Sequence, residues 1–241
     1  MTSDEPATIV DPGRDDPLRT PNGPVELDPP ALVAFDFDGT LVDQRGGWLL
    51  LQELFGTRNE GERLGERYRD GTLTFAEWCD ANAELWADRG VRRGHVEDAA
   101  AAVKLTTGAR RLLERLQRSA YPFGTISGGL LELQQVLDEF EPAFRIANEL
   151  QFDPSGRIVG TTARVGPDDK DEVLGALCRS YDVDLDAVVY VGDSHTDVEA
   201  LEVAGTSILF DPDDRIDPTA IDGLDVVIDD RTLDHVSALL P

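Results

Sequence analysis

The sequence predicts an α/β fold: a doubly wound, Rossmann-like parallel sheet that carries an inserted block of helices. From residue 106 onward, short apolar runs alternate with helix-length segments, which is typical of parallel strands joined by crossover helices. Residues 43–105 break this alternation because they have helical periodicity alone. At 241 residues and 41% hydrophobic side chains, the chain suits one such domain with an insertion.

Residues 1–30 differ in composition from the rest of the chain. They hold seven of the 14 prolines, and seven acidic residues against two basic ones. Such a segment buries too little apolar surface to offset the entropy of ordering its backbone, so we expect a disordered tail. It has neither a basic start nor an apolar stretch, and no signal peptide is expected. The core is then expected at 31–42 and 106–241, with the helical insertion at 43–105.

The first strand is expected at Ala31–Phe35, an apolar run that ends at polar, turn-forming residues. In the insertion, Thr74 and Glu77 have the spacing of a helix capping box. The four helices expected there are Trp48–Phe55, Glu60–Arg69, Phe75–Ala87 and His95–Val103.

Helices and strands are expected to alternate after the insertion. The helices are Ala109–Ser119, Leu131–Phe140, Lys170–Tyr181, Asp197–Ala204 and one near residue 235. The strands are Phe123–Ile126, Arg145–Ala147, Ala187–Val191, Ser207–Phe210 and Asp225–Ile228, with a hairpin across Gln151–Val165 that turns at Pro154–Gly156.

The charge balance argues against several classes of partner. Acidic residues number 48 against 22 basic ones, for a net charge of −26 and an isoelectric point near 4.2. Nucleic acids and anionic membranes repel such a protein, so neither is expected as a partner. No apolar run approaches the ~18 residues of a membrane span. With only Cys79 and Cys178, a disulfide framework is excluded and a reduced, cytoplasmic location is expected.

Arginine greatly outnumbers lysine among the basic residues: 20 are arginine, and Lys104 and Lys170 are the only lysines. An acid-rich, lysine-poor composition resembles that of halophilic archaea. In molar salt the Debye length falls to ~3 Å, which makes the self-repulsion of so many carboxylates tolerable.

Polar residues follow three of the expected strands. Asp36 and Asp38 follow the first, Ser127-Gly-Gly the next, and the run from Asp193 to Asp197 a later one; Lys170 begins a helix. Because ligands bind beyond the carboxyl ends of strands in an open parallel sheet, we expect these groups to converge.

This set of residues suits phosphoryl transfer. Clustered carboxylates repel one another unless a hard cation lies among them, and oxygen ligands suit Mg²⁺. A serine hydroxyl, backbone N–H groups freed by glycines and a lysine can hold a dianionic phosphoryl group. An aspartate can act as nucleophile and form an aspartyl-phosphate. A second carboxyl two residues on can protonate the leaving oxygen and then activate water.

The motifs resemble those of a known superfamily. Asp36-Phe-Asp-Gly-Thr-Leu-Val, Ile126-Ser-Gly-Gly, Lys170 and Gly192-Asp-Ser-His-Thr-Asp are similar, in order, to the four motifs of the haloacid dehalogenase superfamily. The chain is most similar to its phosphoserine phosphatase-like branch, which carries a small helical cap between the first strand and the rest of the core. The resemblance covers about residues 31–230, including Asp70–Phe75 and Ala147–Leu150.

The resemblance implies catalytic and metal-binding roles. Asp36 is the implied nucleophile, and Asp38 the implied general acid and base. Mg²⁺, the implied cofactor, is held by the Asp36 side chain, the Asp38 backbone carbonyl and Asp193.

The resemblance also implies how the phosphoryl group is bound. Its oxygens contact Ser127, the Gly128 N–H and Lys170. Asp197 orients Lys170 or the water shell of the metal, and Thr40 supports the site.

The implied function is a Mg²⁺-dependent phosphomonoester hydrolase that acts through an aspartyl-phosphate on a small phosphorylated metabolite, with O-phospho-L-serine as the first candidate. Three positions depart from the phosphoserine-binding pattern. Arg45 replaces a glutamate that pairs with the substrate ammonium, Asn82 an arginine that holds its carboxylate, and Thr196 an asparagine. Since arginine reverses the sign of the first interaction, the alternative is another small phosphomonoester: a phosphorylated sugar, phosphocholine, phosphoethanolamine or another dianionic metabolite.

Other classes fit the sequence less well. A receiver domain that signals through phosphoaspartate is shorter and has no cap, and a dehalogenase would not need Asp38. A phosphate-binding protein without catalysis would not need every chemical position filled, and a phosphomutase shares the motifs.

Some conspicuous residues also have structural interpretations. His195 is expected to be a solvated group at the pocket rim. Trp48, Trp78 and Trp86 can either pack the core of the cap or line a larger pocket.

Overall fold

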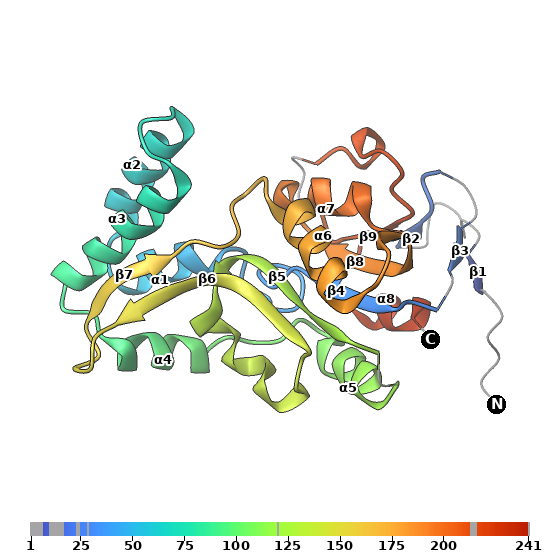
Figure 1. Cartoon of the computed structure of the whole chain (residues 1–241), viewed down its shortest axis with the longest axis horizontal. Coiled ribbons are helices and arrows are strands. Elements are labelled where there is room, and N and C mark those ends of the chain that lie inside the picture. The colour runs from blue at the N-terminus through green and yellow to red at the C-terminus, as the bar shows by residue number, and fades with distance from the viewer. Residues whose placement is uncertain are drawn as a thin grey trace.

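The computed structural model describes residues 7–9, 17–22, 25–27, 29–119, 121–212 and 216–240. Its centre is an eight-stranded sheet in the order β2-β10-β9-β8-β4-β5-β6-β7 (Figure 1). The parallel strands are β4 (Leu32–Phe35), β5 (Phe123–Leu130), β6 (Phe144–Phe152), β8 (Val188–Gly192), β9 (Thr206–Phe210) and β10 (Val226–Ile228). The edge strands β2 (Leu18–Arg19) and β7 (Ile158–Thr162) pair antiparallel. The expected parallel α/β core is therefore confirmed.

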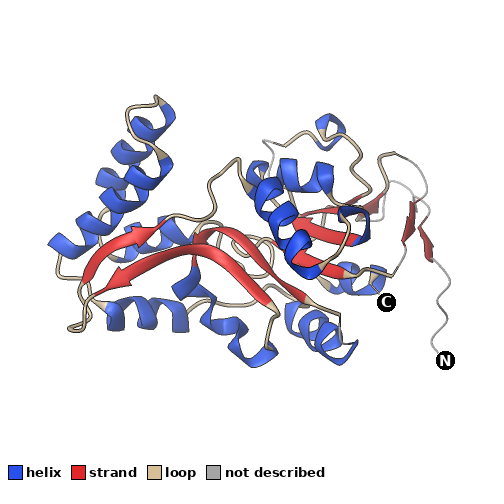
Figure 2. Ribbon diagram, viewed as in Figure 1, coloured by secondary structure: helices blue, strands red, loops and turns tan. Residues whose placement is uncertain are grey.

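Helices cover both faces of this sheet (Figure 2). Successive residues of β4 point to opposite faces, which places Val33 and Phe35 in one apolar cluster and Leu32 and Ala34 in another. The first cluster includes side chains of α5 (Ala109–Ser119) and α8 (Asp234–Leu239), and the second those of α6 (Lys170–Tyr181) and α7 (Val198–Val203). The sheet is thus doubly wound, as expected.

Four helices leave the sheet after β4. They are α1 (Gly47–Leu54), α2 (Arg58–Arg69), α3 (Phe75–Asp88) and α4 (Arg93–Ala101). The chain departs and returns at one place, because Val42 and Leu105 form an antiparallel bridge and the Asp43 amide donates to the Lys104 carbonyl over 3.0 Å. We call residues 43–105 the cap. The expected capping box of Thr74 and Glu77 begins α3.

The N-terminal segment differs from the expected disordered tail over residues 1–30. β1 (Ala7–Ile9) pairs with β3 (Val25–Leu27), and β2 pairs with β10. The expectation is wrong for these stretches, because backbone hydrogen bonds between paired strands do not depend on apolar side chains. In the pairing of β2 with β10, for example, the Asp229 amide donates to the Pro17 carbonyl over 2.8 Å. For residues 1–6, 10–16, 23–24 and 28 the expectation lies outside the described residues.

Two elements after the cap also differ from expectation. β5 runs to Leu130 rather than ending at Ile126, with an irregular register between Ser127 and Leu130. The segment expected as the next helix is a 3₁₀ helix, η1 (Leu131–Phe140). Ser127-Gly-Gly therefore lies within an irregular strand end rather than in a loop.

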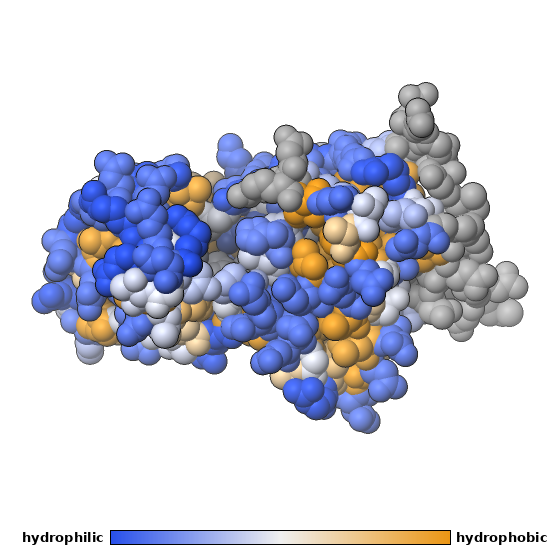
Figure 3. All heavy atoms as spheres, turned by 90° about the horizontal axis from the view of Figure 1, so that it is seen from above, coloured by the Kyte–Doolittle hydropathy of each residue, from blue (hydrophilic) through white to orange (hydrophobic). Residues whose placement is uncertain are grey.

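The face drawn in Figure 3 is mostly hydrophilic, with apolar residues between the polar ones. Leu54, Val159, Tyr181 and Val203 are the large apolar side chains exposed among the described residues. No helix in the described ranges is both long and apolar enough for a membrane span.

Candidate active site

Side chains from three segments meet where β4 and β8 end. The Asp36 amide donates to the Val191 carbonyl over 2.8 Å and so holds the two strand ends together. Lys170, the first residue of α6, donates from Nζ to Asp36 Oδ1 at 2.8 Å and to Asp197 Oδ1 at 2.6 Å. These three side chains are almost fully buried. The expected convergence at the carboxyl edge of the sheet therefore occurs.

Asp197 is fully occupied by hydrogen bonds. Its Oδ1 also accepts from the Tyr190 hydroxyl at 2.8 Å, while Oδ2 accepts from the backbone amides of Asp193 and Ser194 and from the Ser194 hydroxyl. Burial alone would raise the pKa of Asp197, but the charge and hydrogen bond of Lys170 outweigh it and hold that pKa below its ordinary value. Asp197 is thus an ionised anchor for Lys170.

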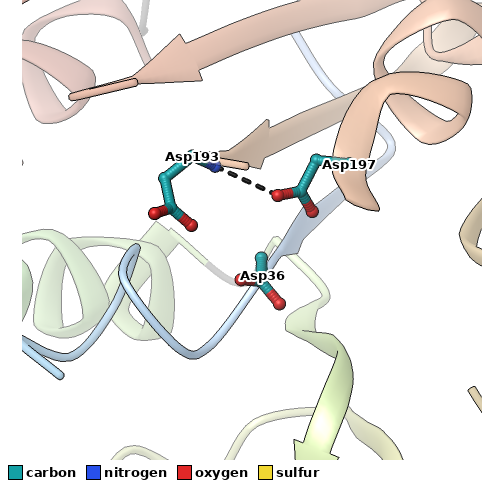
Figure 4. Close-up of side chains that lie close together, drawn as sticks. All are labelled: Asp36, Asp193 and Asp197. Atoms are coloured by element: carbon teal, nitrogen blue, oxygen red, sulfur yellow. Dashed lines mark hydrogen bonds between the residues drawn. The ribbon is translucent and has the colours of Figure 1, made fainter. Parts of the chain in front are cut away.

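Asp36, Asp193 and Asp197 form a carboxylate cluster in which one oxygen of each lies within 4.8 Å of the others (Figure 4). Burial raises the pKa of Asp36, and the charges on Asp197 and Asp193 raise it further against the effect of Lys170. Burial and the charge on Asp197 likewise raise the pKa of Asp193 to about 7. Because these carboxylates are costly to ionise together, and all donors are oxygens, the cluster fits a hard divalent cation such as Mg²⁺.

Asp36 and Asp193 are better placed than Asp197 to bind such an ion. Lys170 occupies one oxygen of Asp36, and no described donor holds the other. Asp193 accepts a long hydrogen bond, 3.4 Å, from the Thr40 hydroxyl and pairs with Arg45 Nη1 at 3.2 Å. Both carboxylates therefore keep lone pairs for a cation, whereas those of Asp197 are taken.

Asp38 joins the core to the first helix of the cap. Its carboxylate accepts hydrogen bonds from the backbone amide of Gly47, the first residue of α1, at 3.0 Å and from the side-chain amide of Gln44 at 3.3 Å. Burial raises its pKa despite both donors. Gly129 is required beside it, since a Cβ atom there would collide with the Asp38 carboxylate. A carboxyl with a raised pKa at the edge of a cavity can act as a general acid.

The strand end at Ser127-Gly-Gly is held in place from both sides. The Ser127 hydroxyl accepts from the Gly129 amide at 3.0 Å. The Gly128 carbonyl accepts from the Trp48 indole N–H at 3.0 Å and from the Asn148 side-chain amide at 2.8 Å. The sequence-based reasoning assigned no role to Asn148, although it noted the stretch that contains it.

Tyr190 is a second residue of the site that the expected set does not include. It is fully buried on β8, and its hydroxyl donates to the same oxygen of Asp197 as Lys170 does. A tyrosine within the otherwise aliphatic strand Val188–Gly192 was the available signal.

A cavity of about 280 Å³ opens over this cluster. Its core side is lined by Asp36, Asp38, Ser127, Gly128, Gly129, Pro167, Lys170 and the run Asp193–Thr196. Its cap side is lined by Arg45, Gly46, Gly47, Trp48, Phe75 and Trp78. The expected catalytic and phosphate-binding residues thus share one cavity with the cap.

The three departures from the phosphoserine-binding pattern lie in different environments. Arg45 and Thr196 line the cavity. Asn82 does not: it is fully buried within the cap, accepts from the Gln52 side-chain amide at 2.8 Å and donates to the Trp78 carbonyl at 2.8 Å. Asn82 therefore stabilises the cap rather than contacting a ligand.

The tryptophans serve both of the purposes that the sequence left open. Trp48 packs on Trp78 and on Trp86, with ring centroids 4.8 and 5.7 Å apart. Trp86 is fully buried, whereas Trp48 and Trp78 also line the cavity. His195 lies exposed at the cavity rim, as expected.

Comparison with known proteins identifies similar sequences. The model of the haloacid dehalogenase-like hydrolase family matches residues 33–202. A phosphoserine phosphatase of Archaeoglobus fulgidus is 28% identical over 185 residues, which cover 74% of this chain and 52% of that protein. A phosphoserine phosphatase of Halobacterium salinarum is 30% identical over 226 residues, covering 83% of this chain and 98% of that protein. The chain thus spans about half of the first relative and nearly all of the second.

A solved structure shares the fold. A phosphoserine phosphatase bearing a phospho-aspartyl intermediate analogue superimposes with a TM-score of 0.69 at 24% identity, over 89% of this chain and 100% of the other. At this identity the match concerns the architecture of core and cap.

Proposed function

The chain belongs to the haloacid dehalogenase-like hydrolase family, and from that premise we propose that it is a Mg²⁺-dependent phosphomonoester hydrolase acting through an aspartyl-phosphate on Asp36. The observation that carries the proposal is the placement of Asp36. One of its oxygens is held by Lys170 Nζ at 2.8 Å, and its carboxylate lines the cavity with Ser127 and Asp38. A nucleophile, a phosphate cradle and an acid thus share one small space.

The ion is proposed to bind the Asp36 side chain, the Asp38 backbone carbonyl and Asp193. When bound, Mg²⁺ neutralises negative charge on the phosphoryl group and on the carboxylates around it. The free lone pairs of Asp36 and Asp193 support this ligand set.

The side chains of the protein divide the remaining work. The Ser127 hydroxyl, the Gly128 amide and Lys170 Nζ hold the phosphoryl oxygens. An Asp36 oxygen attacks phosphorus, and the bond to the leaving oxygen breaks while Asp38 gives that oxygen its proton. Asp38 then takes a proton from water, whose oxygen attacks the aspartyl-phosphate, releasing phosphate and restoring the Asp36 carboxylate.

The first candidate substrate is O-phospho-L-serine, since the relatives at 28% and 30% identity are phosphoserine phosphatases. A second candidate is a different small phosphomonoester. It is favoured by a specific observation: the cap presents Arg45 to the cavity and buries Asn82 away from it.

Phosphate release in molar KCl, with and without Mg²⁺, tests the proposal. The panel comprises O-phospho-L-serine, phosphorylated sugars, phosphocholine, phosphoethanolamine and p-nitrophenyl phosphate. We expect Mg²⁺-dependent release from at least one compound, stopped by EDTA and absent in Asp36→Asn. A folded protein that binds Mg²⁺ but cleaves none of them, or one whose turnover survives Asp36→Asn, would contradict the proposal.

A further inference from the structure

Arg45 is the cationic side chain that the cap contributes to the cavity, among the described residues that line it. We propose that Arg45 binds a second anionic group of the substrate. The enzyme then acts on small phosphomonoesters whose leaving group carries a negative charge, such as a carboxylate. This inference rests on the proposed function and names its substrate class.

The guanidinium lies close to the reaction centre. Arg45 Nη1 is 3.2 Å from Asp193 Oδ2, and Asp193 is part of the carboxylate cluster that contains Asp36. Arg45 is therefore separated from the nucleophile by one carboxylate. The side chain is 37% exposed, so a ligand in the cavity can reach it.

Asp211 holds Arg45 in position, but it shares its carboxylate with a second arginine. Arg45 Nη2 donates to the backbone carbonyl of Asp211 at 2.6 Å and to its carboxylate at 2.7 Å. The same carboxylate oxygen accepts from Arg231 Nη1 at 2.7 Å, so its single charge is shared between two guanidinium groups. Arg231 also donates to the Asp43 carbonyl at 2.7 Å, which ties this arrangement to the start of the cap. Arg45 is thus held in a fixed place by a carboxylate that it shares with Arg231.

The remaining partner of Arg45 is a proposed metal ligand. If Asp193 held Mg²⁺, its negative charge would be shared with the ion and its attraction for Arg45 would weaken. An anionic group on the substrate is the complement that restores a partner to this donor.

The other cap residues that line the cavity carry no charge. Trp48, Phe75 and Trp78 present aromatic surface, and Lys170 is engaged by two carboxylates. The acidic residues lining the cavity are Asp36, Asp38 and Asp193, which belong to the reaction centre. An ammonium group on the leaving group therefore meets no dedicated carboxylate among the described residues, whereas a carboxylate meets Arg45. The cavity therefore favours a leaving group with a negative charge over one with a positive charge.

Three phosphonates, which cannot be hydrolysed, test a carboxylate and an amine on the leaving group separately. 4-Phosphonobutanoate carries only the carboxylate, 3-aminopropylphosphonate only the amine, and 2-amino-4-phosphonobutanoate both. Their dissociation constants are measured by calorimetry in molar KCl with saturating Mg²⁺. We expect the carboxylate-only compound to bind about 10- to 100-fold more tightly than the amine-only compound, the range of a charge-assisted hydrogen bond.

Variants locate the effect. Arg45→Gln removes the preference, Arg45→Lys keeps part of it, and Arg45→Glu reverses it. Arg58→Gln is the matched control, because Arg58 pairs with Glu53 on the outside of the cap and does not line the cavity. We expect this variant to keep the wild-type preference for the carboxylate-only compound over the amine-only compound. Thermal unfolding of each variant shows that it is folded.

Three results would overturn the inference. In the first, the wild type binds the two singly charged compounds equally. In the second, Arg45→Gln weakens all phosphonates and inorganic phosphate by the same factor, which assigns Arg45 to the phosphoryl group. In the third, Arg45→Gln changes only the affinity for Mg²⁺, which makes Arg45 a competitor for Asp193.

These results are distinguishable from failure of the proposed function. Asp36-dependent cleavage of p-nitrophenyl phosphate without a carboxylate preference overturns the inference alone. Absence of Asp36-dependent cleavage of every compound in the panel overturns both.

Discussion

On the core side of the cavity, hydrogen bonds of 2.8 and 2.6 Å from Lys170 Nζ join the buried carboxylates of Asp36 and Asp197, and the buried carboxylate of Asp193 lies beside them. On the cap side, aromatic rings pack on one another, and one partly exposed guanidinium supplies the charge. The core side fixes where charge lies, which phosphoryl transfer needs. In the proposed function, the cap side determines which leaving group fits. The proposal therefore assigns reaction type and substrate choice to separate parts of the molecule.

The largest expected effect on the core side is that of Asp36→Asn. An amide is too weak a nucleophile to form the acyl phosphate, so we expect phosphate release to fall by at least about 10⁴-fold on every substrate. Steady-state assays with O-phospho-L-serine and p-nitrophenyl phosphate measure this loss, and circular dichroism checks the fold. Substantial residual activity in a folded variant would remove Asp36 from the role of nucleophile.

Lys170→Met tests whether the core side is a tightly coupled unit. The substitution leaves Asp36 and Asp197 buried without their shared cation, and breaking a buried pair in this way costs about 3–5 kcal/mol of unfolding free energy. We expect a loss in that range in urea unfolding, together with loss of activity. Lys104→Met, a change of the same type outside the cavity, is the control. Equal stability of the two variants would show that the buried charges are not coupled.

The raised pKa of Asp193 predicts a pH dependence of stability without metal. Between its ordinary pKa of 3.8 and its folded value of about 7, the folded protein holds a proton that the unfolded chain has released. Its contribution to the unfolding free energy therefore falls as pH rises through this window, by up to about 1.4 kcal/mol per pH unit. Affinity for Mg²⁺ rises over the same window, because the ion competes with the proton.

Thermal unfolding in EDTA from pH 4.5 to 8, for the wild type and Asp193→Asn, tests this dependence. We expect the difference between the two proteins to change with pH up to about 7 and to level off above it. A difference that is constant across the window would show that the pKa of Asp193 is not raised.

The smallest expected effect concerns the interior of the cap. Asn82→Ala leaves the buried Gln52 amide without its acceptor, and an unsatisfied buried group costs about 1–3 kcal/mol. Because Asn82 does not line the cavity, kcat/KM on p-nitrophenyl phosphate should stay within about twofold. A loss of activity without a loss of stability would place Asn82 in contact with the ligand and contradict the division of roles.

Much of the core could be predicted from the sequence, because its helices and strand ends depend on local residue patterns. The bounds of α5 and α6 match the expected helices, because their apolar spacing is regular and polar or turn residues flank them. Asp36, Lys170 and Asp193 were expected to meet, because parallel strands place their carboxyl ends at one edge. The haloacid dehalogenase resemblance added the roles of these residues.

Other features depend on segments that are distant in the chain. No local pattern shows that the Tyr190 hydroxyl reaches Asp197, or that Arg45 lies between Asp193 and Asp211. The strand β2 likewise forms only because the edge of β10 is present to pair with it. Such contacts arise from packing between segments that are distant in the chain.

Trapping the covalent intermediate tests the central claim most directly. The protein is mixed with Mg²⁺ and a substrate that it cleaves, quenched in acid during turnover, digested and mapped by mass spectrometry. We expect an acid-stable, base-labile phosphoryl group on the peptide that contains Asp36, present in the wild type and absent in Asp36→Asn. Phosphate on Ser127 or Asp38, or turnover with no phosphorylated peptide under conditions that preserve acyl phosphates, would contradict the assignment of Asp36 as the nucleophile.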